Sequence, residues 1–301
     1  MIVEERYEER LPVALSRKLA DIAQLVKLRL SMLVVFSAVI AFLLASTAGA
    51  IDWSRLLMLV IGGFLVTGSA NGFNQVIEKH ADGLMKRTHN RPLPTGRMSS
   101  LEVISLCIIM GISGVLILGF FTTPLTAYFG AASLVLYSFV YTPLKRKGPI
   151  AVYVGAIPGA MPPLLGWVAA TGSYGLLPGL LFAVQFIWQF PHFWAIAWVA
   201  HSDYAKAGYH LLPLRSGRNR NSALFILVST IMLVPVSLLP IYYGLGGIAS
   251  YVVTLAMSLM LLAQAIRLVR SCESSHARQL MFGSFVYLPV IQLVLMIDKL
   301  V

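Results

Sequence analysis

The chain of 301 residues is 58% hydrophobic and only 12% charged, and its mean hydropathy is +0.80. A soluble domain carries about 25% charged residues, so this composition excludes one and indicates an integral membrane protein. The net charge of +11 would suggest a nucleic-acid partner for a soluble protein. Here membrane topology and anionic headgroups explain the charge, and we expect no nucleic acid partner.

Long apolar windows along the chain predict an all-α protein. Several reach the ~20 residues that a helix needs to cross ~30 Å of hydrocarbon while satisfying its own backbone hydrogen bonds, and a β-barrel does not fit them. We predict a polytopic bundle of nine transmembrane helices, centred roughly on residues 24–47, 55–77, 101–121, 124–143, 150–170, 176–200, 222–243, 248–268 and 279–298. Residues 1–20 are expected to form a cytoplasmic N-terminal segment, and residues 21–301 a single transmembrane domain.

The basic residues indicate how this bundle lies in the membrane. All Lys and Arg residues except Arg55 and Lys299 fall in the N-terminus or in the loops after spans 2, 4, 6 and 8. Because Lys and Arg accumulate in cytoplasmic loops, we predict a cytoplasmic N-terminus and a C-terminus outside. The N-terminal stretch mixes acids and bases and lacks the apolar core of a signal peptide, which favours a bacterial inner membrane.

A set of oxygen ligands follows the second predicted span. Asn74, Glu78 and Asp82 are spaced i, i+4, i+8, which on a helix places all three side chains on one face. Mg²⁺ is usually held by one or two carboxylates while substrate phosphates and water complete its octahedron. For neighbouring cations such as Lys79 and Arg87, a purely topological role is an equal alternative, whereas acids gain nothing from the positive-inside bias. The spacing therefore predicts a metal site at the cytoplasmic end of this span.

The sixth predicted span carries a polar stripe. Gln185, Gln189 and His192 follow i, i+4, i+7, and the same face continues toward Asp203. A polar stripe inside an apolar helix faces a cavity or a partner helix rather than lipid, and Pro191 permits a kink. The stripe predicts either one wall of a site or polar glue between helices.

Several stretches together resemble one family. They are "NQVIEKHADGLMKRTHNRPLPTG", "YTPLKRKGP", "GAMPPLLGW", and "PHFWAIAW" followed by "DYAKAG". The first resembles the first Asp-rich motif of the UbiA superfamily of intramembrane prenyltransferases. The set, which spans about residues 20–300, is similar to the haem O synthase family (protoheme IX farnesyltransferases) within that superfamily.

The resemblance implies a site built around Mg²⁺ and farnesyl diphosphate. The implied metal ligands, which also form the catalytic set, are Asn74, Glu78, Asp82 and, from the opposite half, Asp203. The implied partners of the substrates are Arg87, Arg91, Tyr141, Lys145, Arg146, Gln189 and His192. His192 could contact haem, position a water molecule or simply satisfy Gln189. Two departures are Glu78, where Asp is more common, and Val199, where many members have a further aspartate that would support a second metal ion.

The reaction that this resemblance implies is farnesyl transfer to a vinyl group of haem B with addition of water, giving haem O and diphosphate. The implied partners are farnesyl diphosphate, haem B, the lipid bilayer and, downstream, haem A synthase or a haem-copper oxidase assembly. A prenyltransferase acting on another acceptor, such as a quinone precursor, is an alternative. A transporter or a structural membrane protein is a second one, but it would not require an Asn/Glu/Asp ladder beside Arg91.

Overall fold

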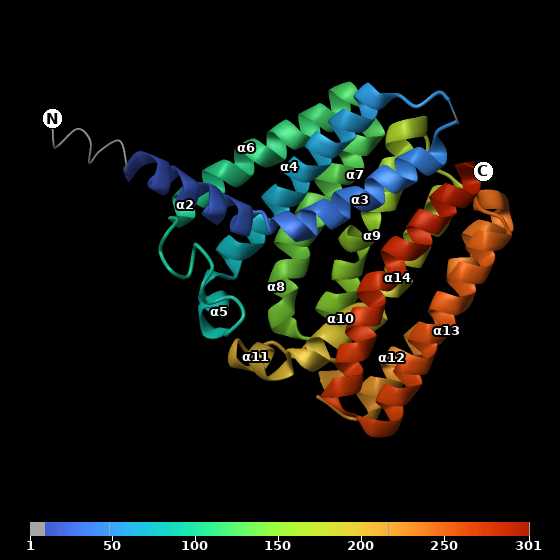
Figure 1. Ribbon diagram of the computed structural model, residues 1–301. Helices are drawn as coiled ribbons and strands as arrows, with labels where there is room; N and C mark the ends of the chain where they lie inside the picture. Colours follow the sequence, from blue (N-terminus) through green and yellow to red (C-terminus); the bar gives the residue numbers. More distant parts are fainter. Residues whose placement is uncertain (1–9, 48, 216, 301) are drawn as a thin grey trace.

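The computed structural model describes residues 10–300 with the exception of residues 48 and 216. In these residues it contains helices and turns but no strand, and nine of the helices are long and apolar enough to cross a membrane (Figure 1). The predicted all-α class and the nine predicted spans are thus confirmed. The protein is a multi-pass membrane protein.

The long spans of the bundle, two of which consist of several consecutive helical segments, follow one another along the chain. They are α3 (Leu28–Ala45), α4 (Trp53–Ile77), α6 (Ser100–Phe121), α7 (Pro124–Val135) continued by η1 (Leu136–Tyr141), α8 (Thr142–Leu144) and η2 (Lys145–Lys147), α9 (Ile150–Thr171), α10 (Leu176–Val199), α12 (Arg220–Pro240) continued by η4 (Ile241–Leu245), α13 (Ile248–Ser271) and α14 (Ser274–Leu300). The shorter elements are α2 (Arg10–Leu25), α5 (Lys79–Leu84), α11 (His201–Lys206) and η3 (Pro213–Arg215).

The N-terminal boundary differs from the prediction. The first span was predicted over residues 24–47, but its helix begins at Leu28 because the chain turns at Lys27, whose φ is 49°. Of the predicted N-terminal segment, residues 10–20 belong to α2, and residues 1–9 lie outside the described residues. The division into this segment and one transmembrane domain remains a prediction.

Glycines bring two helix pairs into backbone contact. A Cβ atom at Gly166 of α9 would overlap with the carbonyl oxygen of Ala38 in α3, and one at Gly114 of α6 would lie 2.9 Å from the carbonyl oxygen of Gly62 in α4. Because lipid removes the hydrophobic drive for helix association, such close packing of small residues holds membrane helices together. The two contacts fix α3 against α9 and α4 against α6.

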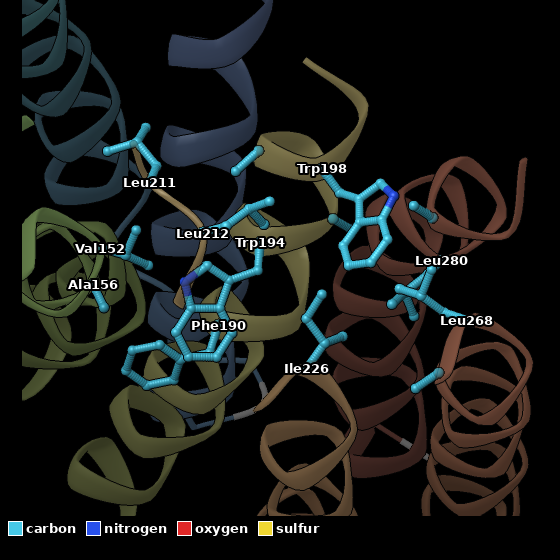
Figure 2. Close-up of a cluster of buried hydrophobic side chains, with 14 of the residues drawn as sticks. Val152, Ala156, Phe190, Trp194, Trp198, Leu211, Leu212, Ile226, Leu268 and Leu280 are labelled. Carbon is cyan, nitrogen blue, oxygen red and sulfur yellow. The ribbon is translucent and has the colours of Figure 1, made fainter. Parts of the chain in front are cut away.

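The largest buried core joins the second half of the bundle to the loop after α11. Figure 2 shows Trp194 and Trp198 of α10 among apolar side chains from α9, from that loop and from α12 to α14. Leu211 and Leu212 belong to this core and are buried, as is Tyr209 just before them. Their burial anchors the loop on the bundle and fixes the position of Tyr209.

The two ends of the bundle differ in their connections. At one end the links between spans are short and include residues 122–123, 172–175 and 246–247. At the other end lie α5 and α11, which Figure 1 shows near each other at the lower left of the bundle. They are in contact there, because Asp203 of α11 accepts hydrogen bonds from the backbone just after α5. We call this end, with the ends of α4 and α10 and the segment 141–147, the polar end.

Candidate active site

Asn74, Glu78 and Asp82 lie where α4 meets α5. All three side chains are buried. Glu78 is the single residue between the two helices, and its φ of −94° and ψ of 7° fall in the bridge region that active-site residues often occupy. The backbone N–H of Glu78 still donates to Asn74 O (3.0 Å), and that of Asp82 to Glu78 O (2.7 Å). The predicted spacing of the three oxygen ligands is therefore kept through the junction.

Glu78 forms a buried ion pair with Lys145. The Lys145 Nζ atom lies 2.9 Å from Oε1 and 3.1 Å from Oε2, and the Tyr209 hydroxyl donates to Oε1 over 3.3 Å. Burial works to raise the pKa of Glu78, but the charge and hydrogen bond of Lys145 outweigh it and hold this pKa below its usual value. Glu78 is therefore ionised at neutral pH, as a metal ligand must be.

Asp82 forms the second buried pair and has one oxygen to spare. The Arg91 Nη1 atom lies 2.7 Å from Oδ2, whereas Oδ1 is buried and has no hydrogen-bond partner within the described part of the chain. Burial raises the pKa of Asp82 against the opposing effect of Arg91. A buried carboxylate oxygen without a partner is costly, so Oδ1 is the atom of this site best suited to bind a cation.

Asn74 connects the site to two other elements. Its Nδ2 group donates to Thr142 Oγ1 (3.1 Å), and its Oδ1 atom accepts from the ammonium group of Lys27 (3.0 Å). Burial, and after it the charges of Arg91 and Lys145, lower the pKa of Lys27 to about 7. The positive charges of Arg91 and Lys145 thus act against protonation of Lys27 as long as the site holds no anionic ligand.

Lys27 and Tyr209 are site residues that the sequence reasoning missed. In the sequence, Lys27 is one of the basic residues that indicate topology, and its position at the start of an apolar run gives no other signal. Tyr209 lies 131 residues from Glu78 along the chain, so no local pattern could connect the two.

The donor set fits a magnesium ion. It offers two carboxylates and an amide oxygen, with Asp82 Oδ1 free of protein partners in the described residues. Within those same residues, no three His, Cys, Asp or Glu side chains are grouped as a complete metal site. Because Mg²⁺ usually takes only one or two carboxylates and completes its shell with phosphate oxygens and water, the incomplete protein shell agrees with a metal that arrives with a diphosphate.

Asp203 lies beside the segment that follows α5, and its carboxylate accepts hydrogen bonds from the backbone of that segment. Its Oδ1 accepts the backbone N–H of Lys86 (2.8 Å), and its Oδ2 accepts that of Arg87 (3.1 Å). Although desolvation works to raise it, the pKa of Asp203 is lowered by these two hydrogen bonds. Asp203 therefore holds the segment after α5 against α11, and its role as a metal ligand stays a prediction.

The other basic and hydroxyl residues of the predicted set differ in how far their side chains are exposed. The ring of Tyr141 lies under the ammonium group of Lys145, 4.8 Å from ring centroid to Nζ, as in a cation–π contact. Arg87 is exposed and reaches the Tyr204 hydroxyl over 3.4 Å, and Arg146 is exposed. The structure thus brings Tyr141 into the site and leaves Arg87 and Arg146 at its surface.

The polar stripe of α10 contacts neighbouring helices rather than the acid ladder of Asn74, Glu78 and Asp82. Gln189 donates to the carbonyl oxygen of Ala156 in α9 (3.0 Å). The Nδ1 atom of His192 lies 2.8 Å from Ser284 Oγ in α14, and its ring is stacked on Trp188 with 4.4 Å between centroids. These contacts match the glue alternative. The acceptor-side roles of Gln189 and His192 remain predictions.

An apolar cavity begins about one helical turn from Asn74. Its volume is about 130 Å³, and it lies between α3, α4, α7 and α9. Asn71 and Tyr137 line the end near the acid ladder, and Leu59 and Leu118 line the far end. Leu59 and Asn71 are twelve positions apart along α4, which corresponds to ~18 Å of helix at 1.5 Å per residue. The cavity is therefore long and suits an extended hydrocarbon chain.

Residues 34–288 match the model of the UbiA prenyltransferase family. The chain therefore belongs to this family of membrane prenyltransferases. Among its relatives are the protoheme IX farnesyltransferase of Cytophaga hutchinsonii, 46% identical over 277 residues that cover 92% of this chain and 96% of the relative, and that of Christiangramia forsetii, 42% identical over 287 residues that cover 94% of both.

Solved structures show the same fold at much lower identity. A structure reported for digeranylgeranylglyceryl phosphate synthase has a TM-score of 0.79 at 17% identity and covers 94% of this chain and 99% of its own. A UbiA homologue from Archaeoglobus fulgidus bound to GPP and Mg²⁺ has a TM-score of 0.65 at 11% identity and covers 92% of this chain and 99% of its own.

Proposed function

We propose that this protein transfers the farnesyl group of farnesyl diphosphate to a vinyl group of haem B, with addition of water, and releases haem O and diphosphate. One observation carries the proposal: a buried cluster of acidic and basic side chains lies about one helical turn from a long apolar cavity. A prenyl diphosphate has the same division into a charged head and an apolar tail. The identity of 46% to a protoheme IX farnesyltransferase supports haem as the acceptor.

The buried cations of the site are suited to the leaving group. Breaking the C1–O bond of an allylic diphosphate leaves its electron pair and negative charge on the diphosphate oxygen. Arg91 and Lys145 are already held by Asp82 and Glu78 at distances below 3 Å. Donors fixed in this way stabilise developing charge without reorganisation, most strongly where water is excluded. Mg²⁺, bound by the ladder residues Asn74, Glu78 and Asp82, would neutralise further charge on the diphosphate.

The apolar cavity is suited to the farnesyl chain. An allylic cation reacts with water if it can, so the tail and its reactive carbon need a dry environment until the acceptor is reached. The new C–C bond forms between this carbon and the vinyl group, and one water molecule then adds to the resulting cation and loses a proton. The cavity walls from α3, α4, α7 and α9 would hold the tail while the polar end holds the diphosphate.

We also infer the orientation and cellular setting of this site. Nearly all basic residues in the described part of the chain belong to segments at the polar end, which favours a cytoplasmic position for it in a bacterial inner membrane, with the C-terminus outside. There it would meet its soluble diphosphate substrate. Haem O would pass from the membrane to haem A synthase or to the assembly of a haem-copper oxidase.

Purified protein supplied with farnesyl diphosphate, Mg²⁺ and haem B tests the proposal. We expect diphosphate release and a product heavier than haem B by one farnesyl group plus one water. A quinone precursor supplied in place of haem B should give no product. Prenylation of the quinone precursor but not of haem B would contradict the assigned acceptor, and absence of diphosphate release with either would contradict the reaction.

A further inference from the structure

The turn between α2 and α3 holds a lysine in an unusual backbone conformation. Lys27 has a φ of 49° and a ψ of 58°, in the left-handed region that is uncommon for residues other than glycine and asparagine. Such a conformation costs free energy and persists only where the surroundings determine it.

Side chains of α4 hold this turn in place. Gln75 donates its Nε2 group to the carbonyl oxygen of Leu25 (2.5 Å), and Asn71 donates its Nδ2 group to that of Val26 (3.2 Å). The Ser31 hydroxyl also donates to the Val26 oxygen (2.6 Å). The two carbonyls before Lys27 are therefore fixed by a buried network that begins one helical turn from the acid ladder.

The result of this arrangement is an ammonium group inside the site. Lys27 Nζ contacts Asn74 Oδ1 at 3.0 Å, whereas Arg29, two residues later, is exposed. A lysine that only set topology would extend to the headgroups as an exposed side chain does. The strained turn and its fixed carbonyls instead direct Lys27 toward the ladder.

The charges of the site indicate what this ammonium group binds. With Lys27 protonated, three basic side chains (Lys27, Arg91 and Lys145) face two carboxylates (Glu78 and Asp82). Buried charges need partners, so this excess of positive charge favours an anionic ligand. The ammonium group already lies on an oxygen of Asn74, at the edge of the site closest to the apolar cavity.

We propose that Lys27 binds the diphosphate of the prenyl substrate as a third cation of the site, and that the turn held by Gln75 and Asn71 positions it for this contact. The inference rests on the proposed function, because it assumes a prenyl diphosphate as ligand.

Binding of farnesyl S-thiolodiphosphate, a slowly reacting analogue, to the purified protein with Mg²⁺ tests the inference. The informative variant is Lys27→Gly, because glycine accepts the left-handed conformation and removes only the side chain. Lys27→Met keeps an unbranched side chain of nearly the same length without its charge. Arg29→Met is the matched control, since it removes an exposed positive charge from the same segment.

We expect Lys27→Gly to melt at or above the wild-type temperature and to bind the analogue at least tenfold more weakly, with Lys27→Met equally weak and Arg29→Met close to wild type. Wild-type affinity in Lys27→Gly would overturn the inference, and so would equal losses in Lys27→Gly and Arg29→Met, which would indicate a general effect of charge. A Lys27→Gly variant that fails to fold would show that the ammonium group has a structural role instead.

Measuring the wild type first keeps this test separate from the proposed function. If wild-type protein binds no prenyl diphosphate analogue, the proposed function fails, and the inference fails with it. If it binds the analogue, the comparison of variants decides the role of Lys27 whatever the acceptor is.

Discussion

Asp82 and Glu78 have different relations to their cationic partners. Glu78 uses both oxygens in contacts with Lys145 and Tyr209, whereas Asp82 pairs with Arg91 through one oxygen and leaves Oδ1 buried without a partner in the described chain. The sequence suggested equivalent ligands at regular spacing. Their partners come from three separate segments, and these set the difference, which a spacing argument cannot provide.

Removing either charge should slow the reaction strongly. Asp82→Asn and Glu78→Gln keep the shape of the side chain and should each cost ~2–4 kcal/mol of transition-state stabilisation, by analogy with other preorganised electrostatic groups. That corresponds to a rate lower by roughly 30- to 900-fold. Initial rates of product formation measure the effect. Asp21→Asn, which breaks the surface pair with Arg97, should stay near the wild-type rate. Near-normal rates for both ladder variants would refute the metal assignment.

The guanidinium group of Arg91 should matter more than its charge. Among the residues that the structure describes, the Arg91 side chain is hydrogen-bonded only through Nη1, to Asp82, which leaves the rest of the planar group to form paired hydrogen bonds with diphosphate. We expect a partial loss of kcat/KM for farnesyl diphosphate in Arg91→Lys and a severe loss in Arg91→Ala. Arg87→Ala should be milder, because Arg87 is exposed. Equal tolerance at the two arginines would mean that neither binds diphosphate.

His192 allows a test between an acceptor role and packing. If it serves the acceptor side, His192→Ala should depress haem O formation while Mg²⁺-dependent binding of farnesyl diphosphate stays near wild type. Ser284→Ala removes only the hydroxyl group that contacts the imidazole, and it should retain more activity. Normal turnover in His192→Ala, or failure of this variant to accumulate in the membrane, would leave packing as its only role.

At the scale of elements, the sequence predicted the spans well and their junctions poorly. Span length and hydropathy are set by the thickness and apolarity of the bilayer, and each apolar segment satisfies these two requirements independently of the other segments. The break before Leu28 depends instead on hydrogen bonds from Gln75 and Asn71, side chains more than forty residues away. The segment η1, which ends at Tyr141 shortly before Lys145, is a π-helix, and the sequence did not predict this wider helical turn either. The spacing thus predicted the acid ladder, and the family resemblance added Arg91, Tyr141 and Lys145. Lys27 and Tyr209, which long-range contacts bring to the site, were not predicted.

The cavity beside α4 offers a prediction on chain length. A Cβ atom at Gly63 would meet only Val35 Cγ2 within 4 Å, at 3.8 Å, and both residues line the cavity. Gly63→Leu should therefore fill this space and weaken farnesyl diphosphate binding more than geranyl diphosphate binding. Gly179→Leu is the matched control, because Gly179 is exposed on α10 with nothing within 4 Å of its Cβ position. An unchanged ratio of the two affinities in Gly63→Leu would place the tail elsewhere.

At the scale of the whole molecule, charge, burial and topology agree on one polar end. The acid ladder, the segment 141–147 and the loop after α11 meet there, and the large core of α9 to α14 holds the last of these in place. The nine described spans put the start of α3 and the end of α14 at opposite ends of the bundle, as the predicted topology requires. A charged reaction site can thus face water while its apolar substrate tail remains at membrane depth.

The haem composition of membranes tests the central claim most directly. The wild-type chain or Asp82→Asn would be expressed in a bacterial host that makes no haem O of its own. The masses of the extracted haems would then be measured by mass spectrometry. Wild-type membranes should contain a species heavier than haem B by one farnesyl group plus one water, and Asp82→Asn membranes should contain little of it. Haem B alone in membranes where the wild-type protein has accumulated would contradict the account.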